Sequence, residues 1–425
     1  MTDRAGDGVY RLINTVQEYS WGSRSAIPEL LGLPSPADAP QAELWMGAHP
    51  KSPSWVQLDD ENRISLADMI ARDPVGVLGG AVAEKFSGRL PFLFKVLAAA
   101  RPLSIQAHPN RQQAREGFSR ENRRGIALDA FDRNYRDDNH KPEIVSALTP
   151  FWAMNGFRPP AEIAGLFGSV GFSSLGEPLR SFRSEPSPAG LKSLFAALMR
   201  LKPGQREHAV AEAVRWAREG ARRGADAAAD GTEAAFSRAS GTDTAIPGWI
   251  LHLAEQYPDD IGVLSPLLLN LVLLQPGDTM FLQAGVLHAY LQGTAIELMA
   301  NSDNVIRGGL TPKHVDVEEL LTILRFEGGG IRLSEAVETA PGVRVFPTPA
   351  EEFSLAEVRV EAKNPYRSPS SGRIELMIAV EGEGRLEAAS MHMTIRRGDS
   401  LLVTAATGAY SIRGSLDLYK AFVPS

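Results

Sequence analysis

The spacing of apolar residues changes three times along this chain of 425 residues. Before about residue 155, short apolar runs such as Leu90–Leu97 and Pro102–Pro109 are bounded by turn residues, which predicts strands. Between about residues 158 and 260, apolar residues recur three and four positions apart, which predicts helices. Strand-like runs return at Leu267–Leu274, a helix is predicted after His314, and short alternating strands fill the rest.

The order of these elements predicts a mainly β fold with a helical insertion. We expect a first, discontinuous β-sandwich (jelly-roll) unit at residues 1–155 and 261–335, and a second at residues 336–425. An all-α domain at residues 156–260 is expected to interrupt the first unit.

The two predicted β units share a weak sequence echo. Gly277 opens a turn and strand eleven residues before His288, and Gly398 opens a similar turn and strand eleven residues before Ala409. Two sandwiches with related hairpins would produce this pattern. Because alanine replaces histidine in the second copy, we expect the C-terminal unit to bind no metal.

Composition narrows the classes of function. With 44 basic and 51 acidic residues the net charge is -7, which argues against a general nucleic-acid binder. The chain has no cysteine, which excludes disulfides, thiolate metal sites and a cysteine nucleophile and suits a reducing compartment. The apolar run Pro266–Leu274 is too short to span a bilayer, and the N-terminus lacks the apolar region of a signal peptide. We expect a cytoplasmic protein without membrane partners.

The segment Leu103–Pro109 carries the first candidate site. If it is a strand, alternation places Ser104, Gln106 and His108 on one face. Buried polar side chains need partners, because an unsatisfied group costs about 1–3 kcal/mol. The alternative is an edge strand with this face in solvent.

A second candidate is Asn139–Glu143. Pro142 favours an extended conformation for the residue before it, so Lys141 and Glu143 share a face and His140 lies to the side. The alternative is a surface Lys–Glu pair of little energetic value. The apolar strand that follows argues for partial burial.

The third pattern runs from Pro276 to Tyr290. Gly277, Gly285 and His288 are spaced as in the second motif of cupins, where glycines form a tight hairpin and the histidine is a metal ligand. The proline usual in that motif is Gln283 here.

Together the three motifs offer two imidazoles, one carboxylate and one amide, a set suited to Zn²⁺ or a similar divalent ion. A site with a single carboxylate keeps positive charge and favours a developing oxyanion.

A fourth stretch, Thr294–His314, combines Glu297 on a strand, a turn at 301–304, and Arg307 before two glycines. Glycines would let the backbone loop so that the guanidinium reaches back over a cleft. The alternative is an ordinary flexible loop with a solvated arginine.

As an ordered set, eight motifs of the chain resemble those of type I phosphomannose isomerases. They are Gln17–Ser23, Ala42–Ser54, Leu90–Leu97, Leu103–Pro109, Asn139–Glu143, Phe151–Pro159, Pro276–Gly293 and Ile296–Asp316. The resemblance implies a cupin-type, zinc-dependent enzyme that interconverts mannose 6-phosphate and fructose 6-phosphate through an enediol and feeds GDP-mannose synthesis. We expect one zinc ion per chain, a phosphosugar substrate and a monomer.

The resemblance also implies roles for individual residues. The zinc ligands would be Gln106, His108, Glu143 and His288. The active site would contain Arg307, Lys141, Glu297, Asp303 and the nearby His140. Phosphate contacts would come from Ser104, Lys95 and Lys313. Which group moves the proton between C1 and C2 stays open.

Two other functions fit part of the pattern. An iron-dependent cupin oxygenase also uses two histidines and a carboxylate, although Gln106 and the charges of Arg307 and Lys141 favour a phosphosugar. A non-catalytic sugar-binding cupin would be expected to have lost ligands, and the first β unit has lost none. The chain lacks a strand-linked G-x-G-x-x-G and a P-loop, so no nucleotide cofactor is indicated.

Overall fold

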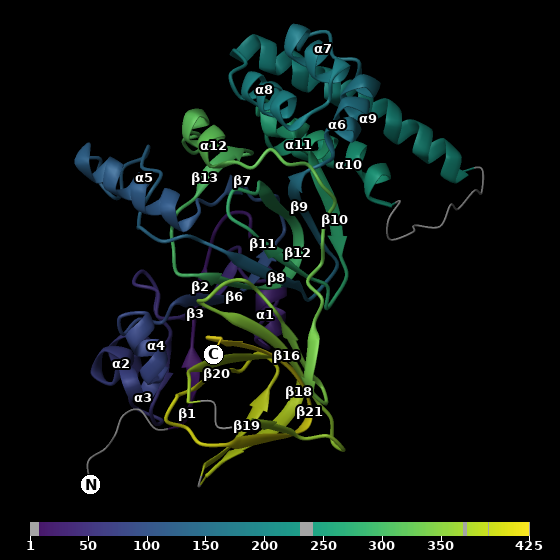
Figure 1. Cartoon of the computed structure of the whole chain (residues 1–425). Helices are drawn as coiled ribbons and strands as arrows, with labels where there is room; N and C mark the ends of the chain where they lie inside the picture. Colours follow the sequence, from purple (N-terminus) through teal and green to yellow (C-terminus); the bar gives the residue numbers. More distant parts are fainter. Residues whose placement is uncertain (1–7, 230–240, 369–371, 390, 425) are drawn as a thin grey trace.

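The computed structural model describes residues 8–229, 241–368, 372–389 and 391–424. In Figure 1 the helical insertion lies at one end of the molecule and the C-terminal strands lie at the other, with most of the remaining strands between them. This arrangement confirms the prediction of a mainly β fold with two β units and a helical insertion. No helix of the described ranges is both long and apolar enough to cross a membrane.

The central strands belong to a sheet of ten strands in the described part of the chain. They are β2 (Thr15–Gln17), β3 (Glu43–Gly47), β6 (Phe92–Ala99), β7 (Ile105–Ala107), β8 (Glu143–Ala147), β9 (Phe151–Phe157), β10 (Leu269–Leu274), β11 (Thr279–Leu282), β12 (His288–Ala300) and β13 (Ile306–Gly309). Every residue of β6 is buried, as its apolar run, interrupted only by Lys95, indicates for a strand covered on both faces.

The second sheet has eleven strands among the described residues. They are β1 (Val9–Ile13), β4 (Trp55–Gln57), β5 (Arg63–Ser65), β14 (Val337–Ala340), β15 (Val343–Phe346), β16 (Ser354–Val360), β17 (Tyr366–Ser368), β18 (Glu375–Ala388), β19 (Met391–Arg396), β20 (Ser400–Val403) and β21 (Tyr410–Phe422). The N-terminal β1 pairs with β20, Val9 opposite Val403, so the two ends of the chain share this sheet. The domain limits given above stay a prediction.

Strand β12 connects two groups of strands in the first sheet. Its first residues pair with β7 and β9, and its later residues pair with β6 and β8. Gly293 lies at the change with a φ of 123°, and a Cβ there would lie 2.5 Å from the main-chain oxygen of Pro150. Glycine is therefore required at this position. Side chains from both groups of strands reach the region beside β12.

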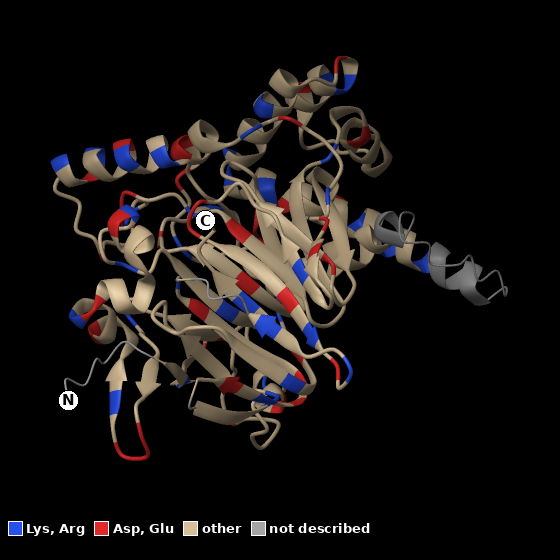
Figure 2. Ribbon diagram, turned by 60° about the horizontal axis from the view of Figure 1, so that its bottom comes forward, with Lys and Arg blue, Asp and Glu red and all other residues tan. Residues whose placement is uncertain are grey.

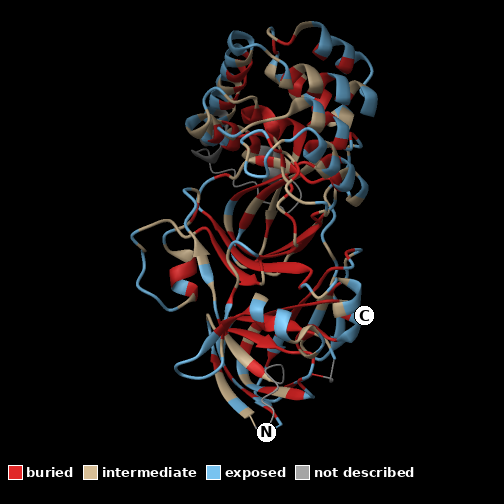
Figure 3. Ribbon diagram, turned by 90° about the vertical axis from the view of Figure 1, so that its left-hand side faces the viewer, coloured by how far each residue is buried: buried red, intermediate tan, exposed pale blue. Residues whose placement is uncertain are grey.

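The helices of the insertion are α6 (Pro160–Val170), α7 (Gly176–Ser184), α8 (Pro188–Met199), α9 (Pro203–Ala229), α10 (Gly241–Gln256), the 3₁₀ helix η1 (Ile261–Leu264) and α11 (Ser265–Leu268). Phe195 of α8 and Phe326 both contact Phe157 of β9, with ring centroids 5.4 Å apart in each pair. One apolar core therefore joins the insertion to the sheet. Figure 3 shows buried residues running through the strands and inner helix faces, with exposed residues on the outer helix faces.

Helix α12 (Val317–Ile323) confirms the helix predicted after His314. Five earlier helices were not predicted: α1 (Ala26–Leu30), α2 (Leu66–Arg72), α3 (Pro74–Leu78), α4 (Gly80–Lys85) and α5 (Arg111–Arg123). The signal for α5 was present in the sequence, because Asn110 and Gln113 form a reciprocal capping box at its start.

Two local expectations need correction. The segment around Arg307 is strand β13 and not a loop, because Arg307 pairs with Gln106 of β7. The strand expected over 103–108 covers only Ile105–Ala107.

Figure 2 shows acidic and basic residues interspersed over helices and strands, in keeping with the modest net charge.

Candidate metal centre

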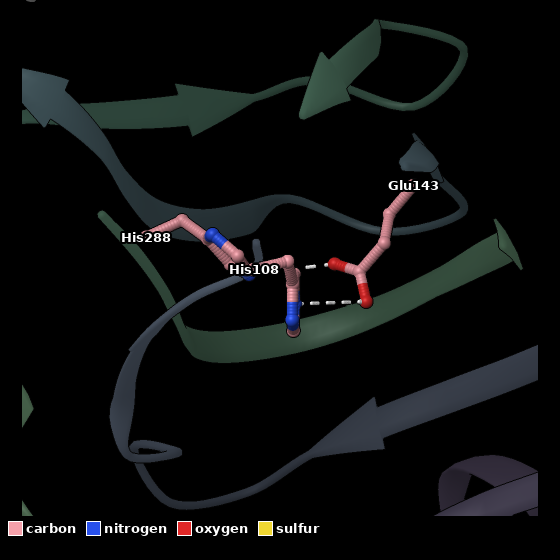
Figure 4. Close-up of side chains that lie close together, drawn as sticks. All are labelled: His108, Glu143 and His288. Carbon is pink, nitrogen blue, oxygen red and sulfur yellow. Dashed lines mark ion pairs between the residues drawn. The ribbon is translucent and has the colours of Figure 1, made fainter. Parts of the chain in front are cut away.

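Three buried side chains converge beside β12. His108 follows β7, Glu143 begins β8 and His288 begins β12, so three separate strands position them. Their exposed fractions are 2%, 1% and 0%, and one potential ligand atom from each lies within 4.8 Å of the others. Figure 4 shows both carboxylate oxygens of Glu143 paired with the two histidines.

The two imidazoles have a defined orientation. Nδ1 of His108 donates to the main-chain oxygen of Asn304 at 2.7 Å, and Nδ1 of His288 donates to that of Val286 at 3.1 Å. Their Nε2 atoms lie 3.3 Å from Oε1 and Oε2 of Glu143, respectively. Backbone acceptors on Nδ1 leave Nε2 as the ligating nitrogen, the usual arrangement around a protein-bound metal.

The buried atoms of this cluster fit a divalent cation. Nε2 of both histidines and Oε2 of Glu143 are buried and make no hydrogen bond to the described residues. Burial lowers the pKa of His108 to about 4, so its imidazole is neutral at neutral pH. Burial raises the pKa of Glu143, but Lys141 and His108 lower it well below its ordinary value. Two imidazole nitrogens and a carboxylate oxygen are ligands that Zn²⁺ prefers.

Strand register brings further predicted residues to this cluster. Gln106 is directly paired with His288 on one side and with Arg307 on the other. Side chains of directly paired residues in antiparallel strands project from the same face, so all three point to the same side. Asn155 of β9, which sequence reasoning missed, is also paired with His288. The role of Gln106 as a fourth ligand stays a prediction.

A second group of charges lies on the strands beside β12. Lys95 of β6 is directly paired with Glu297 of β12, and its Nζ lies 3.0 Å from Glu297 Oε2 and 3.6 Å from Glu43 Oε2. Burial by itself would lower the pKa of Lys95, but the carboxylates of Glu297 and Glu43 raise it by more than burial lowers it. The net pKa is therefore above the ordinary value, and the ammonium stays charged. Burial raises the pKa of Glu297 and of Tyr290. The position of Lys95 between carboxylates was not evident from the sequence.

Lys141 and Asp303 also have specific partners. Nζ of Lys141 lies 2.9 Å from Glu143 Oε1, as the shared face of the two residues predicts. Asp303 lies 2.7 Å from Lys51 and 3.6 Å from His49, and these interactions help to hold its pKa well below the ordinary value despite burial. His49 and Lys51 belong to the motif Ala42–Ser54, and sequence reasoning gave neither a role.

Two further basic residues, Arg136 and Lys313, lie close enough to Arg307 for their charges to interact. Burial, together with the charge of Arg136, lowers the pKa of Arg307, and burial together with both arginines lowers that of Lys313. Arg136 was not predicted and lies in the loop that leads to His140. Ser104 precedes β7 and is half-buried. His140 itself contacts Glu352 of the C-terminal part of the chain, at 2.8 Å.

Three family models match the chain. Residues 9–160 match the catalytic domain of type I phosphomannose isomerase, residues 174–269 its helical insertion domain, and residues 343–423 the cupin domain of mannose-6-phosphate isomerase. The helical and cupin units predicted from the sequence are therefore supported independently.

Curated relatives and solved structures agree with these models. Mannose-6-phosphate isomerase of Escherichia coli K12 is 41% identical over 95% of this chain and 97% of its own, and the human enzyme is 34% identical over 89% and 88%. The structure of a variant phosphomannose isomerase from Salmonella typhimurium has a TM-score of 0.87 and 38% identity, covering 98% of this chain and 100% of that one. A zinc-bound mannose 6-phosphate isomerase structure has a TM-score of 0.85 and 38% identity over the same shares. This chain therefore belongs to the type I phosphomannose isomerase family.

Proposed function

We propose that the protein is a zinc-dependent aldose–ketose isomerase that interconverts mannose 6-phosphate and fructose 6-phosphate. The observation that carries this proposal is the buried cluster of His108, Glu143 and His288, in which Nε2 of both histidines and Oε2 of Glu143 have no hydrogen-bond partner in the described structure. The names of the relatives and a zinc-bound related structure support the reaction and the metal. We also propose that the product serves GDP-mannose synthesis.

His108, Glu143 and His288 would hold the zinc ion, with Gln106 as the fourth ligand. When bound, zinc supplies positive charge that polarises the sugar carbonyl and stabilises a developing oxyanion. Arg307 lies on the same face of the sheet as Gln106, where its guanidinium can stabilise an enediolate oxygen. The carboxyl of Glu297 has a raised pKa and can hold a proton, and Lys141 beside Glu143 is a second group able to move one.

The phosphate would be bound at the end of the site where Arg307, Lys313 and Arg136 gather, with Ser104 as a further donor. The pairing of Lys95 with Glu297 and Glu43 favours a different role for Lys95. Its ammonium orients the carboxyl group of Glu297 rather than contacting the phosphate.

The proposed setting is a monomer in the cytoplasm that binds neither membranes nor nucleic acids. The net charge of -7 and the absence of cysteine support this setting. Light scattering of the purified protein would measure the mass, and a dimer would contradict the monomer.

The test is a coupled assay of mannose 6-phosphate turnover before and after chelation. We expect turnover to vanish with chelator and to return with one equivalent of Zn²⁺. Free mannose should be a far poorer substrate, because part of the phosphate's binding energy orients the sugar. Oxygen consumption without isomerisation would instead support an iron oxygenase, and sugar binding without turnover would support a binding protein.

A further inference from the structure

Glu352, a buried residue of the C-terminal part of the chain, contacts His140 of the predicted active site. Glu352 lies between β15 and β16 and is 1% exposed. Its Oε1 lies 2.8 Å from Nε2 of His140 and accepts a hydrogen bond from Nη2 of Arg111, the first residue of α5. Nη2 of Arg111 also lies 3.0 Å from Nε2 of His140. One carboxylate oxygen is therefore shared by two residues more than 200 positions earlier in the sequence.

The backbone around Glu352 is fixed by packing. Phe346, Ala350 and Phe353 are buried in a core that also contains Leu44 and Phe92 of the first sheet. Such a core leaves little room for the segment to shift relative to the first β unit. The carboxylate thus reaches His140 from a rigid support.

The carboxyl group of Glu352 carries a charge. Burial raises the pKa of Glu352, but His140 and Arg111 lower it below the ordinary value, so the group is ionised. The other oxygen, Oε2, is buried and makes no hydrogen bond to the described residues. The two ion pairs of this buried charge are therefore both made by Oε1, with Arg111 and His140.

His140 is followed by Lys141, Pro142 and Glu143, so its orientation influences a proposed catalytic lysine and a proposed zinc ligand. Pro142 restricts the backbone between them. We propose that Glu352 is a positioning residue through which the C-terminal unit holds His140 and the segment 140–143 in its working geometry. This inference rests on the proposed function of that segment and assigns the C-terminal unit a part in the reaction.

The test compares Glu352→Gln with Glu351→Gln. Glu351 is the adjacent residue, is exposed, and pairs with Lys85 at 3.4 Å, so it controls for loss of one carboxylate in the same segment. We expect Glu352→Gln to lower kcat on the order of 10- to 100-fold with a smaller change in KM, since small displacements of catalytic groups have effects of this size. Glu351→Gln should be near normal, and Glu352→Asp should recover part of kcat.

Two further measurements separate positioning from folding. In a His140→Gln background, Glu352→Gln should have little additional effect on kcat, because both act through one contact. In ¹⁵N-histidine-labelled protein, Glu352→Gln should shift the His140 nitrogen signals and leave those of exposed His392 unchanged. If Glu352→Gln does not fold, Glu352→Asp and Arg111→Lys provide the same two measurements.

Normal kcat in folded Glu352→Gln, or an undiminished effect in the His140→Gln background, would overturn the inference. The nitrogen signals do not depend on any substrate. A wild-type protein without isomerase activity whose His140 signals still respond to Glu352→Gln would refute the proposed function while keeping the contact. Unchanged His140 signals in an active enzyme would refute the contact alone.

Discussion

His108 and Asn304 are joined by a hydrogen bond of 2.7 Å from the imidazole Nδ1 to the main-chain oxygen. The side chain of the fully buried Asn304 bonds in the other direction, to the segment 136–139. Its Oδ1 accepts from the main-chain nitrogens of Arg136 and Asp137, and its Nδ2 donates to the main-chain oxygens of Asp137 and Asn139. One residue therefore links a proposed zinc ligand to the segment that leads into His140.

Replacing Asn304 by Asp should weaken both sides of this link. The change puts an oxygen in place of Nδ2, so the main-chain oxygens of Asp137 and Asn139 lose their hydrogen-bond donor. Each unsatisfied buried group costs about 1–3 kcal/mol. We expect a loss of at least about 2 kcal/mol in the free energy of unfolding and a fall in zinc affinity on the order of tenfold or more. Chemical denaturation of the metal-free protein and competition with a zinc chelator measure the two effects.

Asn301→Ala is the control for Asn304→Asp. Asn301 lies in the same turn, and its Nδ2 donates to Leu90, outside the site. Its loss should lower stability by about 1 kcal/mol without changing zinc affinity. Wild-type zinc affinity in Asn304→Asp would show that the link to His108 has no effect on the metal.

Local spacing predicted the pairs that lie within one motif. Alternation placed Lys141 beside Glu143, where the structure has it. The glycine spacing marked His288 as a candidate ligand, and the structure has it buried beside His108 and Glu143. The contacts of Lys95 with Glu43 and Glu297 depend on the pairing of three strands, which no local pattern encodes. The contact of Glu352 with His140 was harder still to predict, because it depends on how the two β units pack against each other.

Removing Lys95 should destabilise the protein, because it leaves two buried carboxylates without their cation. We expect Lys95→Met to lower the free energy of unfolding by about 3–5 kcal/mol, and Glu297→Gln in the same chain to restore part of the loss. If Lys95 orients Glu297, turnover of mannose and of mannose 6-phosphate should fall by similar factors. Denaturation curves and parallel assays of both sugars test this.

Lys51→Met provides the comparison for stability. Lys51 is exposed and pairs with Asp303 at 2.7 Å, so its removal should change the free energy of unfolding by about 1 kcal/mol or less. A Lys95→Met protein that loses only the preference for the phosphorylated sugar would instead place Lys95 at the phosphate, as the family resemblance implies.

Glu212 should make the helical insertion sensitive to acid. Although burial raises its pKa, hydrogen bonds from the hydroxyls and main-chain nitrogens of Ser173 and Ser174 lower it from 4.5 to about 2. A folded-state pKa below the unfolded value stabilises the protein above the unfolded pKa and loses that effect as pH falls. We expect Glu212→Gln to flatten the decline in stability between about pH 5 and pH 2.

Glu207→Gln serves as the reference for this measurement, because Glu207 is exposed on the same helix, α9. The free energy of unfolding of the Glu207→Gln variant should decline as steeply as that of the wild type when the pH is lowered. An equally steep decline in Glu212→Gln would mean that Ser173 and Ser174 do not depress the pKa of Glu212.

Lys313 and Arg136 should determine the preference for a phosphorylated sugar. In the described structure neither side chain, nor that of Arg307, forms an ion pair or a hydrogen bond to another residue, and the repulsion among them contributes to the lowered pKa of Lys313. A phosphate dianion would neutralise this excess of positive charge. We expect Lys313→Ala and Arg136→Ala each to raise KM for mannose 6-phosphate on the order of tenfold, with little change for free mannose.

The control is Lys202→Ala, because Lys202 is exposed in the helical insertion, and this variant should behave as the wild type.

Inorganic phosphate should compete with mannose 6-phosphate in the wild type and more weakly in the Lys313→Ala and Arg136→Ala variants. Added salt should weaken the binding of phosphate. Zinc content should stay at one ion per chain throughout, because neither residue contacts the proposed ligands and Ala409 leaves the C-terminal unit without a corresponding histidine. Equal losses for mannose and mannose 6-phosphate would show that these cations act on the fold or the chemistry rather than on the phosphate.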